Sequence, residues 1–268
     1  MNTVENNDII IEHSLDNTIP KREGVIQTGI QGLDALFSEN GIPRGNAVMI
    51  AGGPGTGKST LCRQICFNRL QSGTKCMYVS FEETKEKIIR SMVSFGFDIQ
   101  PFIEKEQMLI QNINPLDILR MKFGSLGGTG SATELSYKIK PLIIPKDFHP
   151  EIIVVDSLSA IIAASLTKEK NFRVYLQQLF SFFEDTGATS LLITETDPLP
   201  TKFSETGIEE FLADGIIVLY NVQTDDGRNN AIEVLKMRYG QHEKYIVSMK
   251  ITDHGIEVYP EKKVHIQF

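Results

Sequence analysis

The sequence has few cysteines, three among 268 residues. A small, odd number of cysteines argues against a disulfide framework and is typical of a reducing cytoplasm. The sequence also lacks an apolar run near the roughly 20 residues that a membrane-spanning helix needs. Its first residues are polar and acidic, unlike a secretory signal. Together these absences predict a cytoplasmic protein without a membrane partner.

Basic residues are too few for a broad nucleic-acid-binding surface. Lys and Arg number 27 against 34 Asp and Glu, which gives a net charge of −7. A protein that binds DNA without specificity usually presents an excess of positive charge to the phosphates. We therefore do not expect nucleic acid as a partner, although a local basic patch inside an oligomer is compatible with this charge.

A glycine-rich stretch carries the strongest functional signal. From Gly52 to Ser59 it matches the phosphate-loop pattern G-x-x-x-x-G-K-[ST]. Glycines permit backbone angles that let successive N–H groups surround a phosphate. Lys58 adds a positive charge at the β- and γ-phosphates, and the Ser59 hydroxyl can bind Mg²⁺. The predicted nucleotide-binding residues of the loop are Gly53, Pro54, Gly55, Thr56, Gly57, Lys58, Ser59 and Thr60.

The flanking sequence decides between a phosphate site and a glycine-rich turn that binds nothing. Residues 46–51, before the loop, are typical of a short buried strand. Residues 61–70, after it, are typical of a helix whose N-terminal dipole would point at the phosphates. Strand, loop and helix are all present, and this context favours the phosphate site.

Two further predicted strands end in acidic residues. Residues 75–81 lead into Glu82 and Glu83, and the apolar run 151–155 ends at Asp156. The carboxyl ends of strands beside a phosphate loop are where α/β sheets place their chemistry. A glutamate there can orient or deprotonate an attacking water, and Asp156 would lie next to the magnesium. Alternatively, the two glutamates occupy the first turn of the next helix, where the helix dipole favours acids.

The remaining pattern predicts an α/β fold with a mostly parallel central sheet flanked by helices. The 268 residues are enough for one large domain of this class. Helices are expected over residues 84–97 and 169–185, and strands over 108–112 and 188–194. After residue 213 we expect antiparallel strands that extend the sheet, over residues 215–221, 231–238, 245–252 and 255–259. We expect a tail or arm over residues 1–23 and the domain over 24–268.

Each of three further features allows two interpretations. Thr194, at a predicted strand end, is placed either to sense a γ-phosphate or to make a strand-end hydrogen bond. Cys62 and Cys66 lie one helical turn apart, and they suit buried packing better than a metal pair because no His or Cys cluster accompanies them. The irregular, glycine-rich loop at residues 120–134 is either a contact surface for a protein partner or a plain connection.

Seven segments, in the same order, are similar to the KaiC branch of the RecA-like P-loop ATPases. They are residues 28–34, the phosphate loop, 80–83, 155–157, 209–214, 236–238 and 251–255. The chain resembles a single KaiC domain over about residues 28–260, most closely the hydrolytic domain of the circadian clock protein, and no internal repeat is visible. The resemblance implies a RecA-like fold with ATP and Mg²⁺ as cofactors.

The resemblance also assigns roles to individual residues. Glu82 takes the position of the catalytic glutamate, with Glu83 beside it. Members of the family form hexameric rings with a nucleotide between neighbours, and Lys236 and Arg238 match the pair that reaches the neighbour's phosphates. The implied catalytic residues are Lys58, Glu82, Glu83, Lys236 and Arg238, and the implied metal ligands are Ser59 and Asp156. Other positions matched to the nucleotide are Ser94, Met237, Gly240, His242, Thr252 and Asp253.

The sequence differs from KaiC proteins at two places that bear on function, one a departure from the family pattern and one a difference from the autokinase domain alone. Tyr239 is inserted between the Lys-x-Arg unit and the next glycine, which shifts the match of Gly240 and His242 by one position. The autokinase domain of the clock protein keeps a Ser-Thr pair where this chain has Glu210 and Phe211. Neither of these side chains has a hydroxyl that could accept a phosphate.

These observations predict a Mg²⁺-dependent, ATP-hydrolysing homo-oligomeric ring, a hexamer by resemblance, that acts as a nucleotide-driven switch. The alternatives are a serine/threonine autokinase of KaiC type, a RecA- or RadA-like DNA-associated ATPase, and a nucleotide-binding scaffold with negligible turnover. The paired glutamates argue against the scaffold. The missing basic stripe and the acidic segment 204–210 argue against the DNA-associated ATPase.

Overall fold

The computed structural model describes residues 23–114, 144–166, 172–197, 200, 202–224 and 227–266. Two predictions lie outside these ranges, namely the N-terminal tail apart from residue 23 and the partner contact at the 120–134 loop. The described residues form a nine-stranded sheet and a small antiparallel sheet of β1 (Val25–Ile26) and β2 (Ile42–Pro43).

The large sheet has a parallel half and an antiparallel half. The strands follow the order β11 (Gly255–Lys263), β10 (Val247–Thr252), β9 (Gly227–Met237), β8 (Gly215–Thr224), β3 (Ala47–Gly52), β7 (Thr189–Glu195), β6 (Ile152–Asp156), β4 (Cys76–Ser80) and β5 (Met108–Asn112). Neighbours from β8 to β5 pair in parallel, and neighbours from β8 to β11 pair antiparallel. This confirms the predicted fold class.

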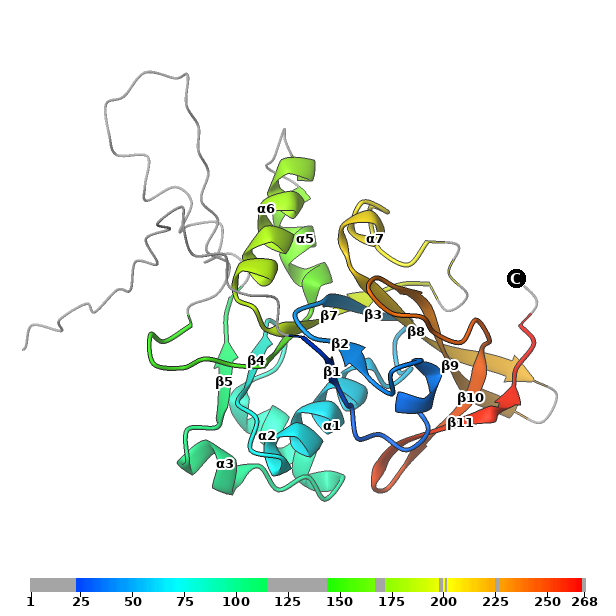
Figure 1. Ribbon diagram of the computed structural model, residues 1–268, viewed down its shortest axis with the longest axis horizontal. Coiled ribbons are helices and arrows are strands. Elements are labelled where there is room, and N and C mark those ends of the chain that lie inside the picture. Colours follow the sequence, from blue (N-terminus) through cyan, green and yellow to red (C-terminus); the bar gives the residue numbers. More distant parts are fainter. Residues whose placement is uncertain are drawn as a thin grey trace, which may run out of the picture.

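Helices cover both faces of the parallel half (Figure 1). One face carries α1 (Lys58–Gln71), α2 (Lys85–Ser94) and α3 (Gln100–Glu104), and the other carries α5 (Leu158–Leu166), α6 (Phe172–Asp185) and the four-residue α7 (Glu209–Leu212). A 3-10 turn, η1 (Asp34–Leu36), precedes β2. Within the described ranges, no helix is long and apolar enough to cross a membrane.

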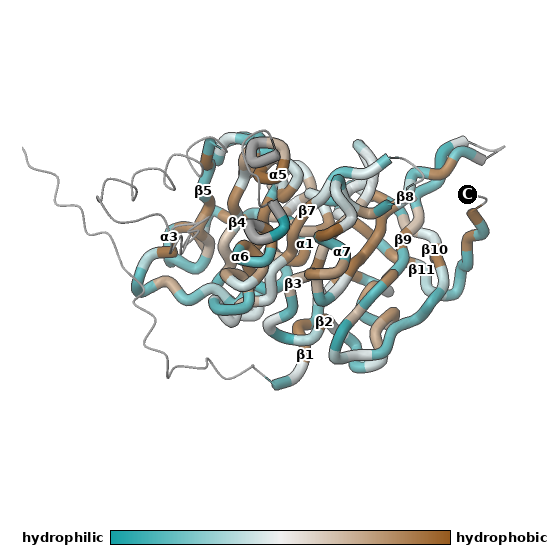
Figure 2. The backbone as a smooth tube through the Cα atoms, turned by 90° about the horizontal axis from the view of Figure 1, so that it is seen from above, coloured by the Kyte–Doolittle hydropathy of each residue, from teal (hydrophilic) through white to brown (hydrophobic). Residues whose placement is uncertain are grey.

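The core consists of two apolar layers, one on each face of the sheet. Every residue of β4 and β6 is buried, because helices on both faces exclude water from both sides of a parallel strand. Successive residues of β3 serve different layers, so that Val48 and Ile50 pack on the α1 side and Met49 packs on the α6 side. Figure 2 shows hydrophobic residues along β7, β3 and β8 in the middle of the molecule.

Of the helices that the structure describes, α3, α5 and α7 were not predicted, and α5 is the longest of the three. α5 begins directly after β6, and its sequence is apolar at nearly every position, without a polar face. A helix that is hydrophobic all round gives no 3.6-residue period from which to recognise it. The next helix, expected from residue 169, is α6, which begins at Phe172 and ends at Asp185 as predicted.

The parallel strands bring distant segments to one edge of the sheet. The register places Gly52 of β3 opposite Glu195 of β7, and Ser80 of β4 opposite Asp156 of β6. The phosphate loop and three acidic strand ends therefore meet at the carboxyl edge, where open α/β sheets bind their ligands.

Candidate active site

The phosphate loop leaves β3 and opens α1. Gly55 and Gly57 have φ angles of 73° and 98°, left-handed values that glycine adopts without steric cost. Gly57 caps α1 directly before Lys58, and a Cβ at Gly57 would lie 2.9 Å from Ile251 Cδ1. The loop conformation thus aims the N-terminus of α1 at the cleft, where the helix dipole attracts phosphate.

Lys58 lies across the loop and is 8% exposed. Its Nζ donates to two backbone carbonyls of the loop, at 2.8 and 2.9 Å. Burial lowers the pKa of Lys58, since the charged form loses water. The carboxylates that oppose this fall belong, in order of strength, to Glu195, Asp156 and Glu82. These acids favour the charged lysine that a phosphate requires.

Asp156 ends β6 and is 6% exposed. Its Oδ2 accepts a hydrogen bond from the Tyr78 hydroxyl, and Arg63 Nη2 lies 3.7 Å from the same oxygen. Burial, together with the neighbouring Asp156, raises the pKa of Tyr78 well above its ordinary value. The phenol therefore stays protonated and continues to hold the Asp156 carboxylate by Oδ2.

The structure separates the two adjacent glutamates. Glu82 lines the cleft, and Ser157 Oγ donates to Glu82 Oε1 at 3.0 Å. Glu83 Oε1 instead pairs with Arg63 Nη2 at 2.9 Å, and Glu83 is not among the residues that line the cleft. Of the two glutamates, Glu82 is thus the one that lines the cleft, whereas Glu83 pairs with Arg63.

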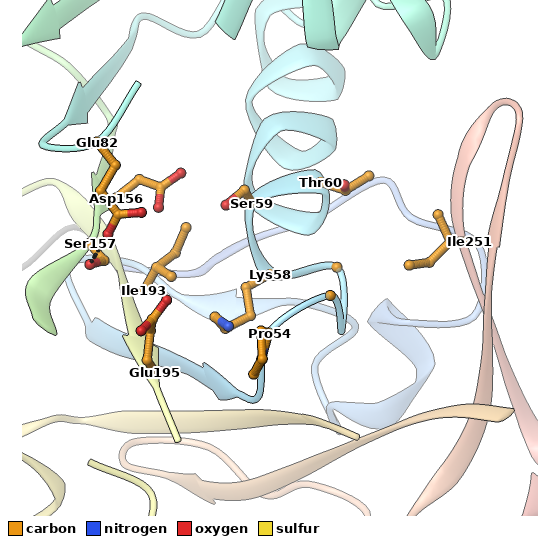
Figure 3. Close-up of a pocket in the computed structure, with 12 residues that line it drawn as sticks. Pro54, Lys58, Ser59, Thr60, Glu82, Asp156, Ser157, Ile193, Glu195 and Ile251 are labelled. Atoms are coloured by element: carbon orange, nitrogen blue, oxygen red, sulfur yellow. Dashed lines mark hydrogen bonds between the residues drawn. The ribbon is translucent and has the colours of Figure 1, made fainter. Parts of the chain in front are cut away.

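The cleft over the loop has a volume of about 360 Å³, within the roughly 300–1,000 Å³ of small-molecule sites. Figure 3 shows Lys58 and Ser59 on the side of the loop and α1, Glu82 and Asp156 opposite Ser59, and Glu195 facing Lys58. The lining residues that sequence reasoning did not propose are Ser157, Ile193, Glu195 and Ile251.

Glu195 is the main functional candidate that sequence reasoning missed. It ends β7, which lies between β3 and β6 in the sheet, and its N–H donates to Ser159 Oγ at 2.9 Å. The acid directly after the strand predicted over 188–194 was a visible signal. Its meaning depends on the strand order, which the sequence does not display.

Comparison with known proteins identifies the family and the fold of the chain. The family model described as "ATPase: KaiC" matches residues 26–263. The chain belongs to the KaiC family of ATPases. This confirms the resemblance seen in the sequence and supports a nucleotide-binding P-loop ATPase.

The relatives include bacterial and archaeal proteins. The circadian clock oscillator protein KaiC of Synechococcus elongatus is 27% identical over 240 residues, which are 88% of this chain and 44% of that protein. The UPF0273 protein PH0284 of Pyrococcus horikoshii is 31% identical over 238 residues, 88% of this chain and 94% of that protein. The crystal structure of the KaiC-like protein PH0186 of the same archaeon matches with 29% identity and a TM-score of 0.72. The match covers 89% of this chain and 100% of that chain. This chain thus spans less than half of the clock protein and nearly all of the archaeal relatives.

The two cations matched to the KaiC family pattern lie together, away from their own cleft. Lys236 pairs with Ile216 of β8, which in turn lies opposite Met49 near the start of β3. The phosphate loop begins at the other end of β3, after Gly52, about 10 Å further along at the rise of a parallel strand. Neither Lys236 nor Arg238 lines the cleft.

Several other matched positions also lie outside the lining of the cleft. They are Gly53, Thr56, Ser94, Met237, Gly240, His242, Thr252 and Asp253. The Met237 side chain is 8% exposed and packs against Gly215 in the core, so no nucleotide contact is proposed for it. Thr252 Oγ1 donates to Gly255 O at 2.9 Å and closes the turn that follows Ile251, a lining residue. A nucleotide contact at the remaining positions stays a prediction.

The structure decides between the open interpretations of Thr194 and of the cysteines. Thr194 is 1% exposed, and its Oγ1 donates to Phe203 O at 3.3 Å, a strand-end hydrogen bond. Cys62 and Cys66 are fully buried in the core. In the described part of the chain, no group of three or more His, Cys, Asp or Glu residues is placed to hold a metal ion.

Proposed function

We propose that this protein is a Mg²⁺-dependent ATPase that works as a homo-oligomeric ring, a hexamer by family resemblance, and uses ATP occupancy or turnover as a switch. The placement of Lys236 and Arg238 at the opposite edge of the sheet from their own phosphate loop carries this proposal. A subunit that presents its loop at one edge and its cations at the other suits a head-to-tail interface, and such interfaces form rings when the rotation between subunits closes.

In this proposal the loop, Lys58, Glu82 and Ser157 each have a task in hydrolysis. The loop N–H groups and Lys58 hold the phosphates, while the Glu82 carboxylate orients the attacking water or accepts its proton. The hydrogen bond from Ser157 to Glu82 sets the direction of that carboxylate. Arg238 of a neighbour stabilises the charge that develops on the transferred phosphoryl group.

The donor set of the cleft fits Mg²⁺. Ser59 and Asp156 both line the cleft and would hold the ion, while the contacts of Asp156 with Tyr78 and Arg63 use Oδ2. Mg²⁺ is usually held by one or two protein carboxylates together with waters and substrate phosphates. A larger cluster of ligands is therefore not required. The ion would neutralise negative charge on the bound phosphates.

The proposal predicts that ATP turnover per chain falls on dilution. Dissociation removes the neighbour's cations from each site, so sedimentation and phosphate release should show the transition at the same protein concentration. The measurement is a dilution series in saturating Mg-ATP, followed by both methods. Full turnover by a monomeric species would contradict an active site shared between subunits.

A second prediction is that the protein stores no phosphate on itself. Ser204 and Thr206 are the hydroxyl residues nearest to Glu210 and Phe211 in the chain, and both donate to Glu209 Oε2, at 2.9 and 2.6 Å. Glu209 is 0% exposed, and its negative charge would repel a phosphate attached to either oxygen.

Incubation with Mg-ATP is therefore expected to leave the intact mass of the chain unchanged. The measurement is intact-mass spectrometry over a time course, with the Glu82→Gln variant in parallel. A stable gain of one phosphate per chain that is lost in Glu82→Gln would favour the autokinase instead.

A further inference from the structure

The two cations proposed for the neighbour's site are tied to one short segment of their own chain. Lys236 Nζ lies 2.8 Å from Glu210 O and 2.6 Å from Ala213 O. Arg238 Nη2 lies 2.8 Å from Phe211 O. All three carbonyls belong to α7 or to the residue that follows it. The position of α7 therefore sets the position of both cations.

α7 depends on tertiary contacts for its place. It has four residues, far fewer than the roughly 12–15 that make an isolated helix even marginally stable. Its first two side chains attach it to the preceding loop. Glu209 Oε2 accepts from the Ser204 and Thr206 hydroxyls. Glu210 Oε1 accepts from the Phe203 N–H at 2.7 Å and from Ser204 Oγ at 3.3 Å.

The same loop is bonded to the edge of the chain's own cleft. The Phe203 carbonyl accepts from Thr194 Oγ1 at 3.3 Å, and the next residue of β7, Glu195, lines the cleft. The Phe203 peptide is thus held by β7 through its carbonyl and by Glu210 through its N–H. Consecutive hydrogen bonds thus link a subunit's own cleft to its own Lys236 and Arg238, the cations that we assign to the neighbour's site.

We propose that Glu210 is a positioning residue that acts on the neighbouring subunit's site by holding α7 in place under Lys236 and Arg238. This inference rests on the proposed ring, in which those cations meet a neighbour's phosphates. Glu210 itself touches no nucleotide. Its side chain is only half-buried, so it can be replaced with less damage to the core than the fully buried Glu209.

The expected result is a loss of kcat in Glu210→Ala that Glu210→Gln avoids. Alanine removes the acceptor of the Phe203 N–H, whereas the glutamine carbonyl oxygen can keep it. A displacement of about 1 Å at a catalytic group can cost about 10²-fold in rate, so kcat should fall by up to about that factor with a smaller change in KM. Glu205→Ala, an equal change of charge on an exposed residue of the same loop, is the control and should retain turnover.

Mixed rings show on which subunit Glu210 acts. Glu210→Ala subunits mixed with Glu82→Gln subunits should regain turnover, since some interfaces then join an intact Glu82 to intact Glu210 and Arg238. Glu210→Ala mixed with Arg238→Ala should not regain turnover. In this proposal Glu210 and Arg238 act from the same subunit, and every subunit in this mixture has lost one of the two. Glu210→Asp, which withdraws the carboxylate by one methylene, replaces Glu210→Ala if the latter does not fold.

Two failures are distinguishable when native mass spectrometry proves subunit exchange. If Arg238→Ala with Glu82→Gln recovers turnover and Glu210→Ala with Glu82→Gln does not, Glu210 serves its own cleft and this inference is overturned. If neither mixture recovers, the shared site itself is wrong and the proposed function fails with it. Equal kcat in Glu210→Ala and the wild type would also overturn the inference.

Discussion

Replacing Arg238 with alanine is expected to lower ATP turnover by about 10³–10⁵-fold, the range measured for arginines that reach a transferred phosphoryl group. In its own chain, Arg238 contacts the Phe211 carbonyl and the Asp214 carboxylate, and its side chain is 44% exposed. The folded subunit should therefore survive the change. The measurement is phosphate release in saturating Mg-ATP, at a protein concentration where sedimentation shows the oligomer.

Arg228→Ala is the matched control for this variant. Arg228 lies at the other end of β9, near the hairpin with β8, and it is exposed. The change of net charge is the same, so a general electrostatic effect on assembly would appear in both variants. Equal turnover in Arg238→Ala and Arg228→Ala would refute a catalytic role for Arg238.

Replacing Glu82 with glutamine is expected to lower turnover by about 10²–10⁴-fold, the usual contribution of a positioned general base. Glutamine keeps the shape of the side chain and its contact with Ser157 but cannot accept a proton. Nucleotide binding should persist in Glu82→Gln, whereas Lys58→Ala should lose it, because the lysine is the positive charge of the loop. Fluorescent-nucleotide titration and phosphate release measure the two properties separately.

The Glu83→Gln variant tests whether the catalytic role belongs to Glu82 and not to its neighbour. It changes the same chemical group one residue further along, where the carboxylate pairs with Arg63 outside the cleft. Its turnover should stay close to that of the wild type, with any loss appearing in thermal stability. A large loss of turnover in Glu83→Gln, with Glu82→Gln still active, would reverse the roles of the two glutamates.

Local patterns made much of the fold predictable. The strand expected over 108–112 is β5, and the four C-terminal strands appear where turn residues separated them. These elements are encoded by alternation and by turn chemistry within a few residues of sequence. α5 was not predicted because its nearly uniform apolar sequence shows no helical period, and its place is set by packing on β7 in the folded sheet.

The sequence by itself determined the phosphate loop, its lysine and serine, and the acids at the ends of two strands, since each of these is a contiguous motif whose geometry is local. Only the tertiary structure decided which acid reaches the cleft. Arg63 of α1 pairs with Glu83 while Glu82 lines the cleft, and the strand order adds Glu195 beside Lys58. The strand register likewise put Lys236 and Arg238 at the far edge of the sheet. Such placements depend on side chains and strands that are distant in the chain and meet only when the sheet and its two helical layers have packed.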